Sequence, residues 1–212
     1  MTAPATEAAR VAPPSKVVAV GASSGGVQAL MQLLPALPAD FAPAMVVVLH
    51  VPADSPTRLV EIFAPRCRVP VVQAEDKLPL SGGTVVFAPP GYHTLLEPDA
   101  TCALSLDAPE HFSRPSINVL FESVAWSWRE RALGILLTGA NADGAEGLAT
   151  IAAAGGQAWI QEPHSAQAQE MPRSALALGF AADTLELRTM SERLARMTHN
   201  CARNFTGLPS GQ

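Results

Sequence analysis

The feature that most constrains this chain is a regular alternation of short apolar runs with segments of helical periodicity. Six runs rich in β-branched residues occupy positions 17–20, 45–49, 69–72, 84–87, 132–137 and 157–160. Such nearly uniform apolar runs are typical of strands that are buried on both faces of a parallel sheet. The alternation therefore predicts an α/β fold, with a doubly wound, mainly parallel sheet and helices on both faces in three layers.

Four segments between these runs carry helix signals. In residues 25–34, apolar side chains recur at intervals of three and four, which predicts a helix with one buried face. The other expected helices run from a cap at 54–56 to residue 63, from residue 115 to residue 124, and from residue 143 to the glycine pair at 155–156.

Residues 84–106 depart from the alternation after their first strand. Two short apolar runs, 92–96 and 102–106, flank the turn-forming sequence Glu97-Pro98-Asp99-Ala100. Two strands separated by such a turn predict a β-hairpin, which we expect to be attached to the sheet.

The length of 212 residues and the 48% content of hydrophobic residues suit one globular domain and leave little room for a second. We expect a mobile leader at residues 1–15, a single domain at 16–190, and a C-terminal helix with a frayed tail at 191–212. Within that last segment, the helix itself is expected at residues 191–204.

The charge pattern excludes several classes of protein. Fourteen basic and nineteen acidic side chains give a net charge of −5, and no basic stripe runs along the chain, so nucleic acid is not the expected partner. No apolar run approaches the roughly 20 residues of a membrane span, and the N-terminus lacks the order of a signal peptide. We therefore expect a cytoplasmic protein without membrane insertion.

Three cysteines, Cys67, Cys102 and Cys201, lie far apart in the sequence and form no CxxC pair. An odd number of isolated cysteines argues against a disulfide framework and against a zinc site. We expect neither a metal nor another cofactor.

The residues just after the strands are the candidates for function, because open α/β sheets bind ligands at the carboxyl ends of their strands. Ser23 lies in the turn GASSGG after the first run, His50 in HVP after the second, and Asp143 in TGANADG after the fifth. A serine, a histidine and an aspartate at one sheet end are a nucleophile, a base and an orienting carboxylate. Together they predict an acyl-transfer site.

Each of these features also has a simpler interpretation. The glycine-rich turn fits a phosphate cradle or tight packing, although it matches neither GxGxxG nor GxxxxGK[ST]. His50 alone fits a hydrogen-bonded core or surface histidine, and Asp143 alone fits an N-cap of the helix that follows it. Only the three residues together predict catalysis.

Other polar residues are weaker candidates. Arg114 and Arg173 each neighbour a proline at a loop-to-helix junction and are candidates for a substrate groove, with helix capping or a surface ion pair as the alternative. The remaining histidines lack metal-ligand spacing and are interpreted as structural or solvated: His93, His111, His164 and His199.

Six motifs follow one another in the chain: VVAVGASSGGVQAL, VVVLHVP, AEDKLPLSGGTVVFAPPGYH, RPSINVLFESVA, ALGILLTGANADGAEGLATIAAAGG and QEMPRSAL. Over residues 16–187 they resemble the catalytic domain of the chemotaxis protein-glutamate methylesterases, the CheB family. The resemblance implies hydrolysis of glutamate γ-methyl esters on the cytoplasmic helices of methyl-accepting chemotaxis receptors, with release of methanol. It also implies deamidation of receptor glutamines, which many members of the family perform.

The resemblance assigns roles residue by residue. Ser23 matches the nucleophile of the family's GAS[ST]GG turn, His50 the base of its [QL]HxP motif, and Asp143 the aspartate of its LTGMGxDG motif. The implied oxyanion-hole candidates are the backbone N–H groups of Ser24 and Ala140.

The chain departs from the family pattern in two ways. Ala140-Asn141 stands where the family has Met-Gly, a change that alters the loop beside the expected oxyanion. Typical members also carry an N-terminal receiver domain, so this chain resembles a free-standing catalytic domain, with a separate receiver domain as a candidate partner. Two alternatives stay open: a serine esterase or amidase of the same fold with another substrate, and a non-catalytic signalling adaptor.

Overall fold

A seven-stranded sheet forms the centre of the molecule in the computed structural model, which describes residues 13–51 and 58–199. The strand order is β3-β4-β2-β1-β7-β8-β9, and every neighbouring pair is parallel. The strands are β1 Val17–Ala22, β2 Ala44–Leu49, β3 Val71–Gln73, β4 Val85–Phe87, β7 Ala132–Leu136, β8 Gln157–Gln161 and β9 Asp183–Leu185. The predicted doubly wound α/β fold is confirmed.

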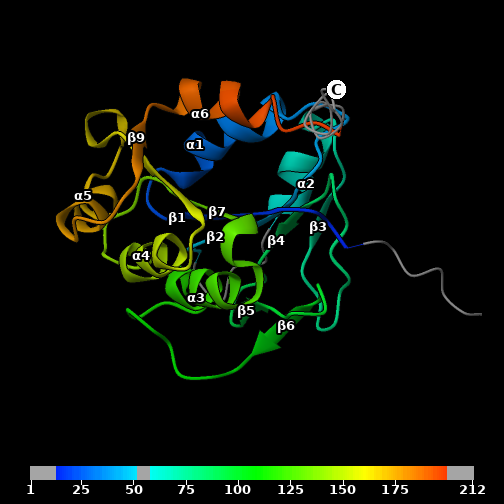
Figure 1. The fold of residues 1–212 in the computed structure, drawn as a ribbon, viewed down its shortest axis with the longest axis horizontal. Helices are drawn as coiled ribbons and strands as arrows, with labels where there is room; N and C mark the ends of the chain where they lie inside the picture. The colour runs from blue at the N-terminus through cyan, green and yellow to red at the C-terminus, as the bar shows by residue number, and fades with distance from the viewer. Residues whose placement is uncertain (1–12, 52–57, 200–212) are drawn as a thin grey trace, which may run out of the picture.

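Helices cover both faces of this sheet (Figure 1). The helices are α1 Gly26–Leu33, α2 Leu59–Phe63, α3 Ile117–Trp128, α4 Ala145–Ala153, α5 Glu170–Ala177 and α6 Leu187–Leu194. Short 3₁₀ turns lie at Leu34–Ala36, Ala64–Arg66, Arg129–Arg131 and Pro163–Ser165. Helices α1, α2 and α6 pack on one face, and α3, α4 and α5 on the other.

The two faces have separate apolar cores, which explains why the strands are apolar along their whole length. Along β1, Val17 and Ala19 join the core under α3 and α4, whereas Val18 and Val20 join the core under α1 and α6. Because successive side chains of a strand point to opposite faces, a strand covered on both faces must be apolar at every position.

The predicted hairpin is present as β5 His93–Leu96 and β6 Cys102–Ser105, paired antiparallel. It forms a two-stranded sheet of its own and does not extend the large sheet. Its attachment is to α3, since Ser123 Oγ accepts a hydrogen bond from the backbone N–H of Leu96 and Ser127 Oγ donates one to the carbonyl of the same residue. The expectation that the hairpin is attached to the sheet is wrong, because the hairpin is attached to α3 instead.

The C-terminal part differs most from the prediction. Helix α6 begins at Leu187 and ends at Leu194, whereas a helix was expected at 191–204. Its buried residues Leu187, Met190 and Leu194 recur at intervals of three and four, a short amphipathic signal inside an otherwise polar segment. Helix α5 and strand β9 were not predicted at all.

Several predictions concern residues outside the described part of the chain. These are most of the leader, the helix cap at 54–56, and the tail beyond residue 199. The division into leader, domain and C-terminal segment therefore stays a prediction. Among residues 13–51 and 58–199, no helix has both the length and the apolar character needed to cross a bilayer.

Helix α3 lies very close to the central strand. A Cβ atom added to Gly21 of β1 would lie 2.2 Å from Cγ2 of Ile117, the first residue of α3. Only glycine permits this approach. It brings the N-terminus of α3 to the carboxyl end of the sheet, where the candidate site lies.

Candidate active site

Three adjacent central strands, β2, β1 and β7, end beside one another and position the candidate site. Ser23 follows β1 and His50 follows β2, and the two strands pair with Ala22 opposite Leu49. The backbone N–H of His50 donates to the carbonyl of Ala22 at 3.0 Å, which extends the pairing by one residue. The strand register therefore places Ser23 and His50 at the ends of neighbouring strands, although 27 residues separate them in the sequence (50 − 23).

Asp143 reaches the same place from the loop between β7 and α4. The chain reverses its direction of travel across the sheet between β1 and β7, which is the switch point where open α/β sheets bind ligands. The side chain of Asp143 is completely buried. A buried carboxylate requires several donors or a cation to offset its lost hydration.

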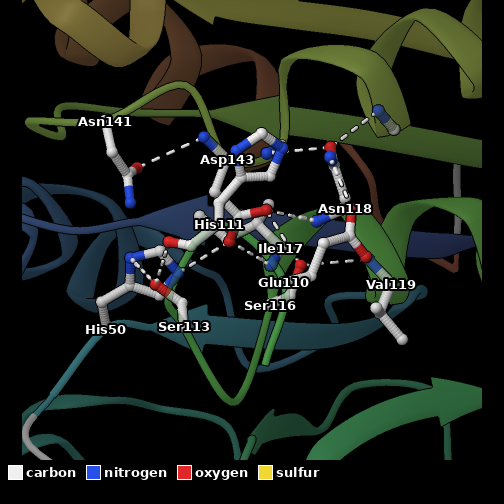
Figure 2. A network of polar contacts seen from close by, with 12 residues as sticks. His50, Glu110, His111, Ser113, Ser116, Ile117, Asn118, Val119, Asn141 and Asp143 are labelled. Carbon is white, nitrogen blue, oxygen red and sulfur yellow. Dashed lines mark hydrogen bonds and ion pairs between the residues drawn. The ribbon is translucent and has the colours of Figure 1, made fainter. Parts of the chain in front are cut away.

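Each carboxylate oxygen of Asp143 accepts two hydrogen bonds (Figure 2). Oδ2 accepts from His50 Nε2 at 2.8 Å and from the backbone N–H of Ile117 at 2.7 Å. Oδ1 accepts from Ser116 Oγ at 2.9 Å and from the backbone N–H of Asn118 at 3.0 Å. Four donors therefore fix the orientation of the carboxylate.

The backbone donors belong to the first turn of α3, so Asp143 lies at the N-terminus of a helix distant in sequence. This corrects the interpretation of Asp143 as an N-cap of the following helix, because the N-cap of α4 is Gly144 and no side chain caps that helix. Burial alone would raise the pKa of Asp143, but hydrogen bonds from His50 and from the N–H groups of Ile117 and Asn118 outweigh it and hold the pKa below the usual carboxyl value. The carboxylate is therefore ionised at neutral pH.

The hydrogen bond to Asp143 also defines which nitrogen of His50 can act as a base. An ionised carboxylate only accepts, so Nε2 of His50 carries the proton and the lone pair of the neutral ring lies on Nδ1. The His50 side chain is 12% exposed, so the ring is largely but not completely buried. His50 is thus neither an isolated core histidine nor a free surface histidine.

The Ser23 turn is held by backbone contacts. The N–H of Ser23 donates to the carbonyl of Thr138 at 2.9 Å, and Thr138 Oγ1 donates to the carbonyl of Ser24 at 2.8 Å. Gly25 adopts φ +82°, and an added Cβ would lie 2.7 Å from Cβ of Gln167. Within residues 13–51 and 58–199, the structure contains no hydrogen bond of the Ser23 hydroxyl.

The two oxyanion candidates, Ser24 and Ala140, are both exposed at the end of the sheet. Their backbone N–H groups have no acceptor within the described ranges, whereas the adjacent N–H groups of Ser23 and Gly139 already donate to backbone carbonyls at 2.9 and 3.1 Å. A backbone N–H without an acceptor in the protein is available to a negatively charged oxygen.

Sequence reasoning missed the residues that support the base. Ser116 is the N-cap of α3 and donates to Asp143, and Asn118 Oδ1 accepts from the N–H groups of Gly144 and Gly147 at 2.9 Å each. The serine directly after Pro115 is a helix-start signal that could have indicated the N-cap. Nothing in the sequence could indicate that Asn118 bridges two helices.

His93 was interpreted as structural or solvated, and its contacts are structural. Its ring is buried, with Nδ1 accepting from the backbone N–H of Ser116 at 3.1 Å and Nε2 3.1 Å from the carbonyl oxygen of Ala108. The residue thereby connects the hairpin to the N-cap of α3. A further serine, Ser113, places its Oγ 3.5 Å from Nδ1 of His50.

The remaining candidates are less closely connected to these groups. Arg114 is half-buried and donates from Nη1 to the carbonyls of Leu106 and Asp107 at 2.9 and 3.0 Å, and Arg173 is exposed on α5. His111, His164 and His199 are exposed. Among the described residues, no three histidine, cysteine or acidic side chains are grouped so that they could hold a metal ion.

Comparison with known proteins identifies similar sequences and a similar fold. The family model for the CheB methylesterase matches residues 18–194. A putative protein-glutamate methylesterase/protein-glutamine glutaminase of Leptospira interrogans is 38% identical over 185 residues, covering 87% of this chain and 96% of the relative. The protein-glutamate methylesterase/protein-glutamine glutaminase of Symbiobacterium thermophilum is 35% identical over 86% of this chain, which spans 51% of that relative.

A solved structure shows the same architecture. The CheB methylesterase catalytic domain of Thermotoga maritima matches with a TM-score of 0.82 and 25% sequence identity, covering 87% of this chain and 99% of that domain. The sheet order, the site at its switch point and these matches lead to one assignment. The chain belongs to the CheB methylesterase family.

Proposed function

We propose that this chain hydrolyses the γ-methyl esters of glutamate side chains on the cytoplasmic helices of methyl-accepting chemotaxis receptors. Ser23 is the nucleophile, His50 is the general base, and Asp143 orients the base. The observation that carries the proposal is the 2.8 Å hydrogen bond from His50 to the buried carboxylate, with the serine turn on the neighbouring strand. The names of the relatives as protein-glutamate methylesterases support the choice of ester.

In the acylation step, Nδ1 of His50 accepts the hydroxyl proton of Ser23 as Oγ forms a bond to the ester carbonyl carbon. The electron pair of the carbonyl bond moves to oxygen and gives a tetrahedral oxyanion. When this intermediate collapses, the bond to the methoxy oxygen breaks and that oxygen takes the proton from Nδ1, so methanol leaves. Asp143 stabilises the imidazolium without taking its proton.

In the deacylation step, His50 accepts a proton from water while the water oxygen attacks the acyl carbon. Collapse of the second intermediate returns a proton to Ser23 Oγ and releases the glutamate side chain. The enzyme is regenerated, and the net reaction consumes one water per ester. The N–H groups of Ser24 and Ala140 are the proposed donors to the oxyanion in both steps, because the neighbouring N–H groups are already engaged.

The same steps convert a glutamine side chain into glutamate when ammonia is the leaving group, and the glutaminase in the relatives' names supports this second activity. The proposed partners are receptor helices, which lie in the cytoplasm, and a receiver domain is a proposed regulator. Arg114 and Arg173 remain proposals for the substrate groove. Arg114 already binds two carbonyls of its own loop, so Arg173, which is exposed, is the freer of the two to meet a receptor.

The proposal is tested by measuring methanol release from a methylated receptor fragment. Ser23→Ala removes the nucleophile and should reduce kcat by several orders of magnitude, because loss of a nucleophile leaves only the catalysis due to binding and oxyanion stabilisation. Ser191→Ala is the matched control, since Ser191 lies on α6, on the opposite face of the sheet from α3, and among the described residues its hydroxyl bonds only backbone carbonyls. Its rate should equal that of the unmodified protein.

Equal rates for the Ser23→Ala and unmodified proteins would rule out Ser23 as the nucleophile. A marked preference for small methyl esters over receptor fragments would instead favour an esterase with another substrate. Labelling by a fluorophosphonate distinguishes a third outcome: an adaptor without catalysis would leave Ser23 unlabelled.

A further inference from the structure

The nitrogen of His50 that faces away from Asp143 has a neighbour that the proposed mechanism does not use. Ser113 Oγ lies 3.5 Å from Nδ1, the atom that accepts the proton of Ser23 in the proposed reaction. Figure 2 shows Ser113 beside the His50 ring. Ser113 comes from the loop between the hairpin and α3, whereas Ser23 comes from the turn between β1 and α1. Hydrogen bonds in unliganded active sites are often long and shorten when substrate binds.

A tight turn at 110–113 delivers Ser113 to this position. The backbone N–H of Glu110 donates to the carbonyl of Ser113 at 3.1 Å, and the N–H of Ser113 donates to the carbonyl of Glu110 at 2.8 Å. The two central residues, His111 and Phe112, have φ values of +46° and +61°. Consecutive left-handed residues that are neither glycine nor asparagine are costly, and such turns persist only where the surroundings hold them.

The surroundings that hold this turn are the same ones that hold the carboxylate. Asn118 Nδ2 donates to Glu110 Oε1 at 3.0 Å, and the backbone N–H of Asn118 donates to Asp143 Oδ1. One residue of α3 therefore fixes both sides of the His50 ring: Asp143 against Nε2 and, through Glu110, Ser113 against Nδ1. The contact of Ser113 with His50 is thus part of a built arrangement.

The hydroxyl of Ser113 has one proton and two neighbours that can accept it. Besides Nδ1 of His50, the carbonyl oxygen of His111 lies 3.3 Å from Oγ. When His50 is neutral, Ser113 can donate to only one of them. When His50 is protonated, Nδ1–H donates to Oγ and the hydroxyl donates to the carbonyl of His111, so all three groups are satisfied.

We propose that Ser113 is a positioning residue that stabilises the protonated ring of His50 during acylation and deacylation. This inference rests on the proposed function, since it needs His50 to receive the proton of Ser23. Ser113 accepts a hydrogen bond from Nδ1–H until the leaving methoxy oxygen takes the proton. It forms no bond to the substrate, so its effect falls on kcat and leaves KM unchanged.

The decisive pair of variants is Ser113→Thr and Ser113→Val, because their side chains have the same shape and differ by the hydroxyl. With a methylated receptor fragment as substrate, Ser113→Val and Ser113→Ala should reduce kcat about tenfold, as expected for a weak hydrogen bond to a charged group. Ser113→Thr should recover kcat to within about threefold of the unmodified protein, and KM should stay constant throughout.

Ser105→Ala is the control for the loop, since Ser105 ends β6 just before the same segment and its hydroxyl bonds only Asp107 among the described residues. Its kcat should equal that of the unmodified protein. Equal kcat values for the Thr and Val variants would overturn the inference, as would a change confined to KM, which would mean that Ser113 binds substrate.

A second measurement separates this inference from the proposed function. The rate at which a fluorophosphonate labels Ser23 also depends on proton transfer to His50 and needs no receptor. If the unmodified protein releases no methanol but is labelled, the receptor substrate is wrong, and slower labelling of Ser113→Val than of Ser113→Thr still supports the role of Ser113. If Ser23 is not labelled at all, both proposals fail.

Discussion

The two halves of the candidate site are held in different ways. On the acid-base side, the carboxylate of Asp143 accepts four hydrogen bonds, and three of the donors belong to the first residues of α3 or its N-cap. On the serine side, the turn that carries Ser23 is fixed through backbone contacts to Thr138, and its hydroxyl has no partner among the described residues.

The difference follows from what each half has to do. A buried carboxylate must stay charged, and only a complete set of donors makes that stable in a low-dielectric interior. The hydroxyl of a nucleophilic serine must instead stay free to approach a substrate carbonyl, while backbone hydrogen bonds fix the position of the residue. We therefore expect removal of the Asp143 carboxylate to reduce both stability and activity, and removal of the Ser23 hydroxyl, which has no partner among the described residues, to reduce activity without a comparable loss of stability.

The largest expected effect on stability and activity together comes from Asp143→Ala. This change leaves the donors of His50, Ser116, Ile117 and Asn118 without an acceptor, and each buried unsatisfied donor costs about 1–3 kcal/mol. We expect the free energy of unfolding to fall by about 3–5 kcal/mol and kcat to fall about 10⁴-fold, as measured by urea denaturation and methanol release.

Asp143→Asn keeps the size of the side chain and one acceptor oxygen. It should recover part of the lost stability but little of the activity, because the amide group cannot hold the His50 ring in the required tautomer. If both variants unfold at the same urea concentration as the unmodified protein, the hydrogen bonds to Asp143 do not contribute to the stability of the fold.

The serine half is tested by Gly25→Ala. The left-handed φ of Gly25 and the close approach of Gln167 leave no room for a methyl group. Because the turn must shift, we expect kcat to fall about 10- to 100-fold. We expect the free energy of unfolding to fall by about 2–3 kcal/mol. Gly179→Ala is the matched control: its φ is +69° and nothing lies within 4 Å of an added Cβ. It should lose about 1 kcal/mol and no activity.

Lowering the pH should affect the stability contributed by the acid-base half and not that contributed by the serine half. Because the pKa of Asp143 is lowered in the folded state, its ionised form contributes stability in full above the ordinary carboxyl pKa and loses it as the pH falls toward the lowered value. The gap in unfolding free energy between the unmodified protein and Asp143→Asn should therefore shrink from pH 5 to pH 3. The difference in unfolding free energy between the unmodified protein and Gly25→Ala should stay constant over that range. If the two differences changed with pH in the same way, the pH dependence of stability would not come from the Asp143 carboxylate.

The smallest effect is expected from Ser116→Ala, which removes one of the four donors to Asp143 and the side-chain cap of α3. We expect a loss of about 1 kcal/mol in stability and a three- to tenfold lower kcat. Ser116→Thr keeps the hydroxyl and should behave like the unmodified protein. If the Ala and Thr variants lose equal activity, the hydroxyl of Ser116 does not support the carboxylate.

The central strands and the residues at their ends could be predicted because uniform apolar runs permit few folds. The fold prediction is confirmed. Ser23, His50 and Asp143 were predicted from their place after β1, β2 and β7, and their catalytic roles stay proposals. The polar supports of the site could not be found, because Asn118 and His93 act through contacts across 15 to 29 residues that no local pattern encodes. Helix α6 was misplaced because its short apolar stripe is set in a polar segment, where composition gives little contrast.

The position of β1 between β2 and β7 also has a consequence for how the protein folds. The site is complete only when β1 pairs with β7, and that pairing joins Val17 to Ala132, which are 115 residues apart in the sequence (132 − 17). Contacts between such distant residues form late, because closing a long loop costs chain entropy before any contact offsets it. During refolding, esterase activity should therefore return with the last central strand pairing, and it can serve as a reporter of that step.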